Sequence, residues 1–109
     1  MNIEKLRELG ANVDEGLERC MGMEDFYLEM IELGLSDDRF EALGKALEEG
    51  NLDGAFEDAH ALKGVLGNLA LTPLYETVSE ITENLRAKVQ TDYELIYKKI
   101  LSQREAFLQ

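Results

Sequence analysis

Apolar periodicity constrains the fold of this chain more than any other feature. Apolar residues recur every three or four positions nearly throughout, and Pro73 is the only proline among 109 residues. This spacing places the apolar residues on one face of an α-helix, whereas a half-buried strand requires strict alternation, which is absent. The sequence therefore predicts an all-α protein.

Breaks and capping residues divide the chain into helices. The predicted helices run from Asn12 or Asp14 to Met21, from Glu24 to Gly34, from the Ser36–Asp38 cluster to Gly50, from Asn51 through Leu69, from Thr72 through Leu85, and from Thr91 through Phe107. Side-chain oxygens of Asn, Ser, Thr and Asp accept hydrogen bonds from the free amides of a helix start. Pro73 suits the first position of a helix capped by Thr72, and Thr91 with Glu94 has capping-box spacing.

Short connections between these helices favour antiparallel neighbours. We therefore predict an antiparallel up-and-down four-helix bundle, formed by the longer helices after residue 36 together with the helix at residues 24–34. Short N-terminal helical segments would cover one end. No linker composition and no internal repeat divides the chain, so residues 1–109 are expected to form a single domain.

Charge and composition narrow the possible partners. The chain has 11 Lys and Arg against 23 Asp and Glu, a net charge of −12, so nucleic acid and anionic membranes would repel it. Its longest apolar stretch, Val65 to Leu71, is too short to cross a bilayer, and no secretory signal opens the chain. We expect a cytoplasmic monomer that binds neither nucleic acid nor membrane. Cys20 is the only cysteine, which excludes an internal disulfide and a multi-cysteine zinc site.

His60, the only histidine, falls off the predicted buried face of the helix that follows Asn51. That face is expected to comprise Leu52, Phe56, Ala59, Leu62, Leu66 and Leu69. At about 100° per residue, Lys63, Gly64 and Gly67 share the face of His60. Glycine inside a helix costs about 0.5–1 kcal/mol relative to alanine, so the two glycines require an explanation.

Two explanations for these glycines are open. A bare strip beside an exposed imidazole would let another macromolecule bring its own active site onto the ring. Alternatively, glycines allow a neighbouring helix to pack closely, and His60 is then an ordinary surface residue. Two other chemistries have less support: a metal site joining His60 to Asp53 and Glu57, and hydrolysis by a nucleophile beside the histidine. No local signature places Cys20 or one of the serines Ser36, Ser79 and Ser102 in that second role.

The run Ala59-His60-Ala61-Leu62-Lys63-Gly64-Val65-Leu66-Gly67-Asn68-Leu69 resembles the signature of histidine-containing phosphotransfer (Hpt) domains. That pattern is roughly His-x-Leu-Lys-Gly, then small residues and Asn-Leu. Residues 16–22 followed by Phe26-Tyr27, and residues 47–51, also resemble segments of the family, so the resemblance covers roughly residues 10–105. The chain departs from the pattern at Leu66 and Ala70, where the family often has alanine and glycine.

The resemblance implies that His60 accepts a phosphoryl group at Nε2 from an aspartyl phosphate on a response-regulator receiver domain and passes it to a second receiver. A hybrid sensor histidine kinase would be a further partner. In this role Lys63 would offset the charge of the phosphoryl group, and Gly64 and Gly67 would give the receiver room to dock. Asn68 is expected to make a polar contact or cap beneath the helix.

The chain contains neither of the glycine-rich loops that bind nucleotide phosphates. We therefore expect a phosphoryl carrier in a His-Asp phosphorelay that is not itself an enzyme and has no cofactor of its own. Mg²⁺ would come with the partner receiver domain. The alternative is a helical adaptor of the same fold that binds signalling partners without phosphoryl transfer.

Overall fold

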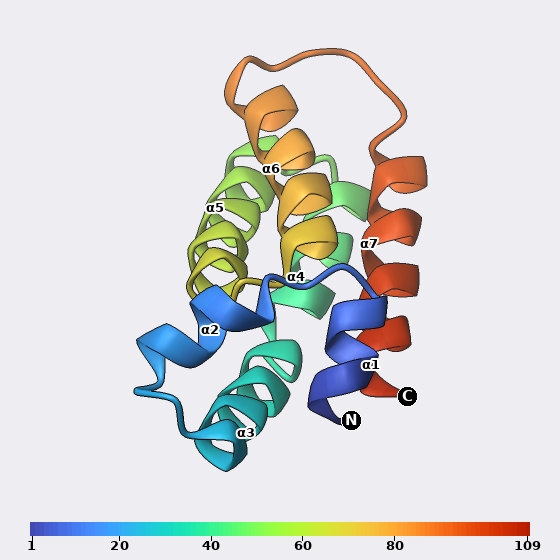
Figure 1. Ribbon diagram of the computed structural model, residues 1–109. Helices are drawn as coiled ribbons and strands as arrows, with labels where there is room; N and C mark the ends of the chain where they lie inside the picture. The colour runs from blue at the N-terminus through green and yellow to red at the C-terminus, as the bar shows by residue number, and fades with distance from the viewer.

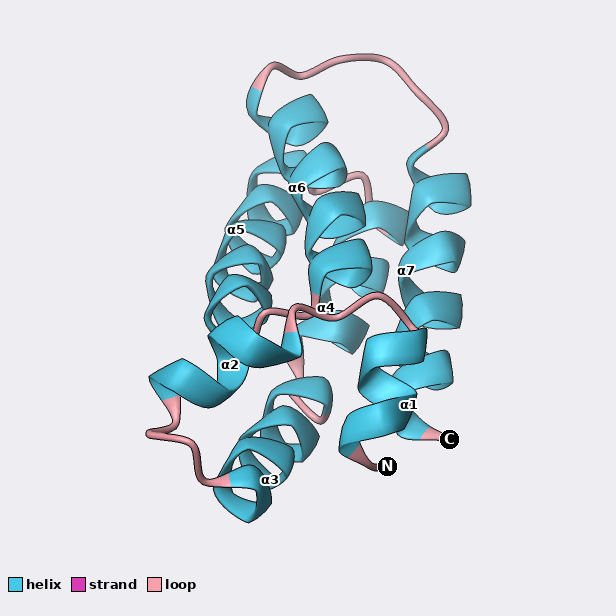
Figure 2. Cartoon of the chain, in the orientation of Figure 1, coloured by secondary structure: helices cyan, strands magenta, loops and turns pink.

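The computed structural model describes residues 1–109 as seven α-helices without a strand (Figures 1 and 2). The helices are α1 (Ile3–Glu8), α2 (Val13–Arg19), α3 (Glu24–Leu35), α4 (Arg39–Glu48), α5 (Leu52–Asn68), α6 (Thr72–Arg86) and α7 (Tyr93–Leu108). The prediction of an all-α fold is confirmed. None of the seven helices combines the length and the apolar composition that crossing a bilayer requires.

Helices α4 to α7 form the four-helix bundle (Figure 1). Helix α5 packs against α4 and α6, and α7 packs against α6 and, more sparsely, against α4. The core between them is fully closed to solvent at Phe40, Leu43, Leu62, Leu66, Leu74, Val78, Ile81 and Ile100. Burial of each such side chain stabilises the fold by about 1.5–3 kcal/mol, so this core provides a rigid support for the outer surface of α5.

The sequence predicted that the helix at residues 24–34 runs alongside the other four. Helix α3 instead lies at the end of the bundle with α1 and α2 (Figure 1). The break before α4 separates the two helices, and there Asp37 accepts a 2.8 Å hydrogen bond from the amide of Arg39. Two hydrogen bonds, one buried and one partly buried, hold α3 in place. The Tyr27 hydroxyl donates to the Leu69 carbonyl at 2.7 Å, and Arg104 Nε donates to the Leu35 carbonyl at 2.6 Å. The molecule is consequently elongated, 41 × 22 × 19 Å.

Two of the predicted N-terminal caps are confirmed. Asn12 accepts a hydrogen bond from the amide of Glu15 at 3.3 Å, and Asn51 accepts one from the amide of Gly54 at 3.0 Å. These caps satisfy amide donors that a helix start leaves unpaired. The Asn51 cap fixes where α5, the helix that carries His60, begins.

Two other predicted caps are wrong. Helix α6 begins at Thr72 itself after Leu71, without a side-chain cap, although Pro73 does lie in its first turn. Helix α7 is capped by Asp92, one residue later than predicted, because its carboxylate accepts a hydrogen bond from the Leu95 amide at 3.0 Å.

Candidate functional site

Three of the rows of side chains along α5 surround or support His60. The buried row packs into the core and comprises Ala55, Ala59, Leu62 and Leu66. An exposed row, which we call the outward row, comprises Asp53, Glu57, His60, Gly64 and Asn68. Between the two, a half-buried row faces α6 and comprises Phe56, Lys63 and Gly67; we call it the α6-facing row. The prediction that His60 lies off the core is therefore confirmed.

The imidazole of His60 stacks on the ring of Phe56, one turn earlier. Their centroids are 5.5 Å apart and the ring planes differ by 12°. The sequence predicted that Phe56 lies on the buried face of α5, but its side chain is only half-buried. Its ring is also contacted by Arg86 of α6, whose guanidinium carbon lies 4.8 Å from the ring centroid. The stack restricts the plane of the imidazole while the side chain stays exposed to solvent.

Lys63 is held by an ion pair with α6. Its Nζ lies 3.5 Å from Glu83 Oε2, and Glu83 Oε1 accepts a 3.1 Å hydrogen bond from Arg86 Nε. That hydrogen bond, with the charges of Arg86 and Lys63, holds the pKa of the Glu83 carboxyl below its ordinary value. Glu83 is therefore an anion with two cationic partners, one of which lies a single turn from His60.

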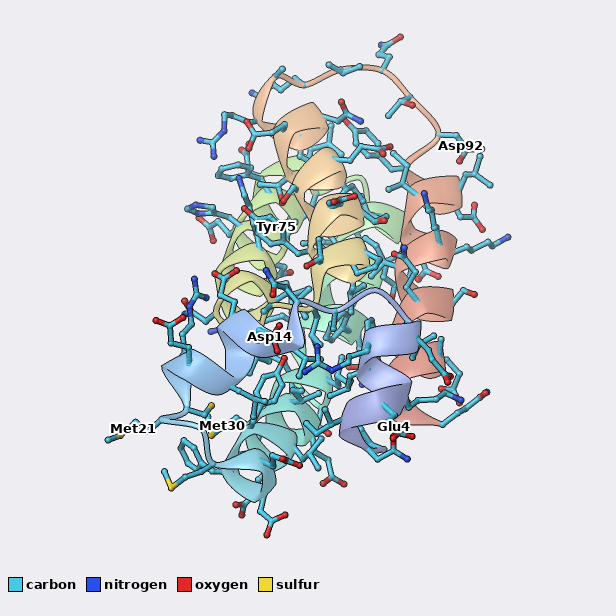
Figure 3. The ribbon with its side chains drawn as sticks, viewed as in Figure 1. Glu4, Asp14, Met21, Met30, Tyr75 and Asp92 are labelled. Atoms are coloured by element: carbon cyan, nitrogen blue, oxygen red, sulfur yellow. The ribbon has the colours of Figure 1, made fainter.

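The two glycines beside His60 have different surroundings. A Cβ atom added to Gly64 would meet no atom within 4 Å, so the surface there is open. A Cβ atom added to Gly67 would lie 3.1 Å from Tyr75 Cε2, a ring that lies between α5 and α6 (Figure 3). Gly64 thus fits the clearance explanation, whereas the space at Gly67 serves the packing of α6.

A hollow of about 570 Å³ opens beside His60 between α2, α5 and α6. Its lining includes His60, Lys63, Gly64, Gly67, Asn68, Arg19 and Tyr75. Asn68 is exposed and lines this hollow, so the expectation of a contact beneath the helix is wrong. Arg19 reaches the hollow from α2, where its guanidinium donates to the Gly67 carbonyl at 2.7 Å. The structure thus brings His60, Lys63, Gly64 and Gly67 together in one surface depression.

Sequence reasoning did not identify Arg19, Glu83 and Arg86 as part of this surface. The i, i+3 spacing of Glu83 and Arg86 predicts that they pair with each other, but it does not predict which helix they face. Arg19 carries no local signal at all, because its place depends on how α2 packs. These neighbours follow from tertiary packing.

The competing chemistries find no support in the geometry. No group of three or more His, Cys, Asp or Glu side chains is arranged to hold a metal ion, so Asp53 and Glu57 do not join His60 in one. Cys20 is buried in the core cluster and does not line the hollow. None of the three serines considered as nucleophiles lines it either.

A family model supplies the assignment. The model of the Hpt domain matches residues 33–106, which is more than half of the chain. The chain belongs to the Hpt domain family. The match contains α4, α5 with His60, α6 and all but the last two residues of α7, and it leaves out α1, α2 and most of α3. Comparisons with curated proteins and with solved structures give no match.

Membership of the family sets the general activity. Hpt domains serve phosphotransfer in His-Asp phosphorelays, as phosphocarrier modules that interact with receiver domains and kinases. At one departure of this chain from the family pattern, the backbone conformation is one that favours the glycine of the pattern. Ala70, which follows α5, has a φ of 58°, in the left-handed region that glycine adopts more readily. Leu66, the other departure, is fully buried and does not alter the outer surface of α5.

Proposed function

We propose that this Hpt domain is a phosphohistidine carrier in a multistep cytoplasmic relay. His60 accepts the phosphoryl group from a receiver-domain aspartyl phosphate and passes it to a second receiver, and a hybrid sensor histidine kinase feeds the relay. The proposal depends on one observation: the only histidine of the chain is exposed on the outward row of α5, next to the open surface at Gly64.

The transfer step follows from the chemistry of a neutral imidazole. The lone pair of Nε2 attacks phosphorus in line with the bond to the aspartate oxygen. A P–N bond forms as that P–O bond breaks, and the aspartate carboxylate leaves with the electron pair. The ring keeps the proton on Nδ1 and carries a positive charge until that proton is released. Transfer to the next receiver reverses these steps.

Each residue near His60 has a distinct part in this step. The stack on Phe56 restricts the plane of the attacking ring, which reduces the orientational entropy that transfer has to overcome. Open surface at Gly64 leaves room for the receiver loops. Lys63 offsets the charge of the phosphoryl group, by a modest amount because solvent screens a partly exposed ammonium. The acidic pocket and Mg²⁺ that hold the phosphoryl group in flight belong to the receiver.

Three basic side chains lie around the site. Arg19 and Lys63 line the hollow with His60, and Arg86 lies on the ring that stacks against the imidazole. Three of the 11 basic residues thus lie at the site of a chain whose net charge is −12. A phosphoryl group therefore meets three local cations, of which Arg19 is paired with Glu15, and Lys63 and Arg86 are paired with Glu83.

The proposal is tested by incubating the protein with phosphorylated receiver domains and Mg²⁺. We expect the wild-type chain to acquire an acid-labile, base-stable label, and His60→Gln to acquire none. Circular dichroism and urea denaturation check that the variant is folded, since an exposed substitution changes stability by only about 0.5 kcal/mol. Label on His60→Gln would refute the assignment of the site. A wild-type chain that binds receivers but is never labelled would instead be the adaptor.

A further inference from the structure

Before any phosphoryl group arrives, Lys63 already has an anionic partner. Its ammonium pairs with Glu83 at 3.5 Å, and its side chain keeps only 29% of its exposure. Lys63 lies one turn from His60 on the same helix, and both line the same hollow. The cation that is placed to compensate a phosphoryl group is therefore engaged elsewhere in the unphosphorylated protein.

The carboxylate of Glu83 cannot follow Lys63 freely, because a second contact fixes it. Arg86 Nε donates to Glu83 Oε1 at 3.1 Å, while the guanidinium of Arg86 lies over the ring of Phe56. That ring is the one on which His60 stacks. A continuous set of contacts thus runs from His60 through Phe56, Arg86 and Glu83 to Lys63, and it holds the carboxylate beside the site.

Phosphorylation adds a charge of about −1.5 to −2 at His60 near neutral pH. Lys63 then lies between two anions, the phosphoryl group on its own helix and the fixed carboxylate on α6. We propose that Glu83 is a positioning residue that competes with the phosphoryl group for Lys63 and so keeps the phosphohistidine form from being over-stabilised. This inference rests on the proposed function of His60.

Competition between Glu83 and the phosphoryl group for Lys63 balances acceptance of the phosphoryl group against its release. A carrier has to accept a phosphoryl group and also release it, so a cation that bound the phosphoryl group at full strength would favour acceptance at the expense of onward transfer. Pairing with Glu83 weakens that binding without removing Lys63 from the site. The Glu83 carboxylate stays charged near neutral pH, since Arg86 and Lys63 both lower its pKa.

The test uses phosphoramidate, a small phosphodonor, to phosphorylate the full chain directly. The imidazole forms a P–N bond as ammonia leaves, so no protein partner is needed. A pH titration followed by ³¹P NMR then measures the acid dissociation constant of the phosphoryl group on His60. Exposed ion pairs change such constants by a factor of about 1.4 to 5. We therefore expect Glu83→Gln, which frees Lys63, to raise the constant about two- to fivefold.

Two comparisons isolate the ion pair from a general change in charge. Glu76→Gln removes the same charge from the same helix at an exposed position that forms no ion pair, and it should leave the constant nearly unchanged. In a Lys63→Met background, Glu83→Gln should have a much smaller effect, because no ammonium is left to release. Urea denaturation should show that both Glu variants unfold at nearly the same urea concentration as the wild type, as expected for exposed substitutions.

The outcomes separate this inference from the proposed function. Equal constants for the wild type and Glu83→Gln, or an equal response to Glu76→Gln, would overturn the inference while leaving His60 as the phosphoryl acceptor. A Glu83→Gln effect that persists in full without Lys63 would also overturn it. Failure of every receiver to label the wild type would refute the carrier function itself, and the inference with it.

Discussion

The outward row and the α6-facing row of α5 lie side by side on one helix, yet their members have opposite environments. In the α6-facing row, Phe56, Lys63 and Gly67 each meet a side chain of α6. In the outward row, the surface at Gly64 is empty, and His60 touches the rest of the fold through Phe56. The two rows of α5 thus differ in kind: the α6-facing row contacts the rest of the fold, and the outward row leaves the open surface at Gly64 that the proposed docking of a receiver requires.

The largest effect should come from filling the vacant surface. Gly64→Gln puts a long side chain where a receiver would approach, and misplacing reacting atoms by about 1 Å can slow a reaction about 100-fold. We expect phosphoryl transfer from a receiver to fall about 10- to 100-fold, measured as the initial rate of labelling. Because no atom lies within 4 Å of the new Cβ position, and glutamine is a better helix former than glycine, urea denaturation should show a protein at least as stable as the wild type. An unchanged transfer rate would refute the division between the two rows.

A substitution at the buried Tyr27 of α3 should have the opposite effect, lowering stability while leaving phosphoryl transfer nearly unchanged. The Tyr27 hydroxyl donates to the Leu69 carbonyl just beyond the end of α5, and Tyr27→Phe leaves that acceptor unpaired. We expect a loss of about 1–3 kcal/mol in the free energy of unfolding. Transfer at His60 should stay within about twofold of wild type, since Tyr27 is buried and does not line the hollow beside His60. A transfer loss as large as that of Gly64→Gln would show that phosphoryl transfer at His60 depends on the packing around Tyr27 as well as on the open surface at Gly64.

The raised pKa of Tyr27 predicts how the free energy of unfolding depends on pH. Burial, with smaller contributions from Cys20 and Glu15, raises the pKa of Tyr27 from 10.0 to about 12. The folded state therefore favours the neutral phenol, so its stabilising contribution is complete below pH 10 and is lost as pH rises towards 12. Burial also raises the pKa of Tyr97. Because Tyr97 also contributes, the effect of Tyr27 is measured as the difference between wild type and Tyr27→Phe in the free energy of unfolding, determined by urea denaturation between pH 10 and 12.

The parts of the site that sequence predicted are those that depend on a single helix. The spacing of apolar residues places His60 on the exposed side of α5, and capping chemistry places the start of that helix at Asn51. Both depend on the local 3.6-residue period. Sequence alone also identified Lys63 and Gly64 as neighbours of His60.

What sequence missed depends on contacts between helices. Helical geometry places both Gly64 and Gly67 on the face of His60, and the position of Tyr75 on α6 gives them different surroundings. Phe56 falls within the apolar line of α5, but the way α6 packs leaves its ring half-buried between His60 and Arg86. Periodicity reports which side of a helix is apolar, and it does not report which neighbour each remaining residue faces.

The smallest effect, and the most direct test of the comparison, comes from alanine at the two glycines. Gly64→Ala should stabilise the protein by about 0.5–1 kcal/mol, because alanine lowers the entropy cost of the helix and its Cβ meets nothing. Gly67→Ala has the same helical advantage, but its Cβ would lie 3.1 Å from the Tyr75 ring, which has to shift. We therefore expect a smaller gain or a loss at Gly67, measured by urea denaturation.

The pair also separates two reasons for having glycine in a helix. If Gly64→Ala stabilises the fold but slows transfer, then the glycine is present for the partner, since nothing inside the molecule requires it. If both substitutions stabilise equally, the Tyr75 ring moves aside without cost, and the α6-facing row is not closely packed at Gly67. In that case Gly67 would have to be grouped with Gly64 as part of the vacant surface, and the boundary between the two rows would move towards α6.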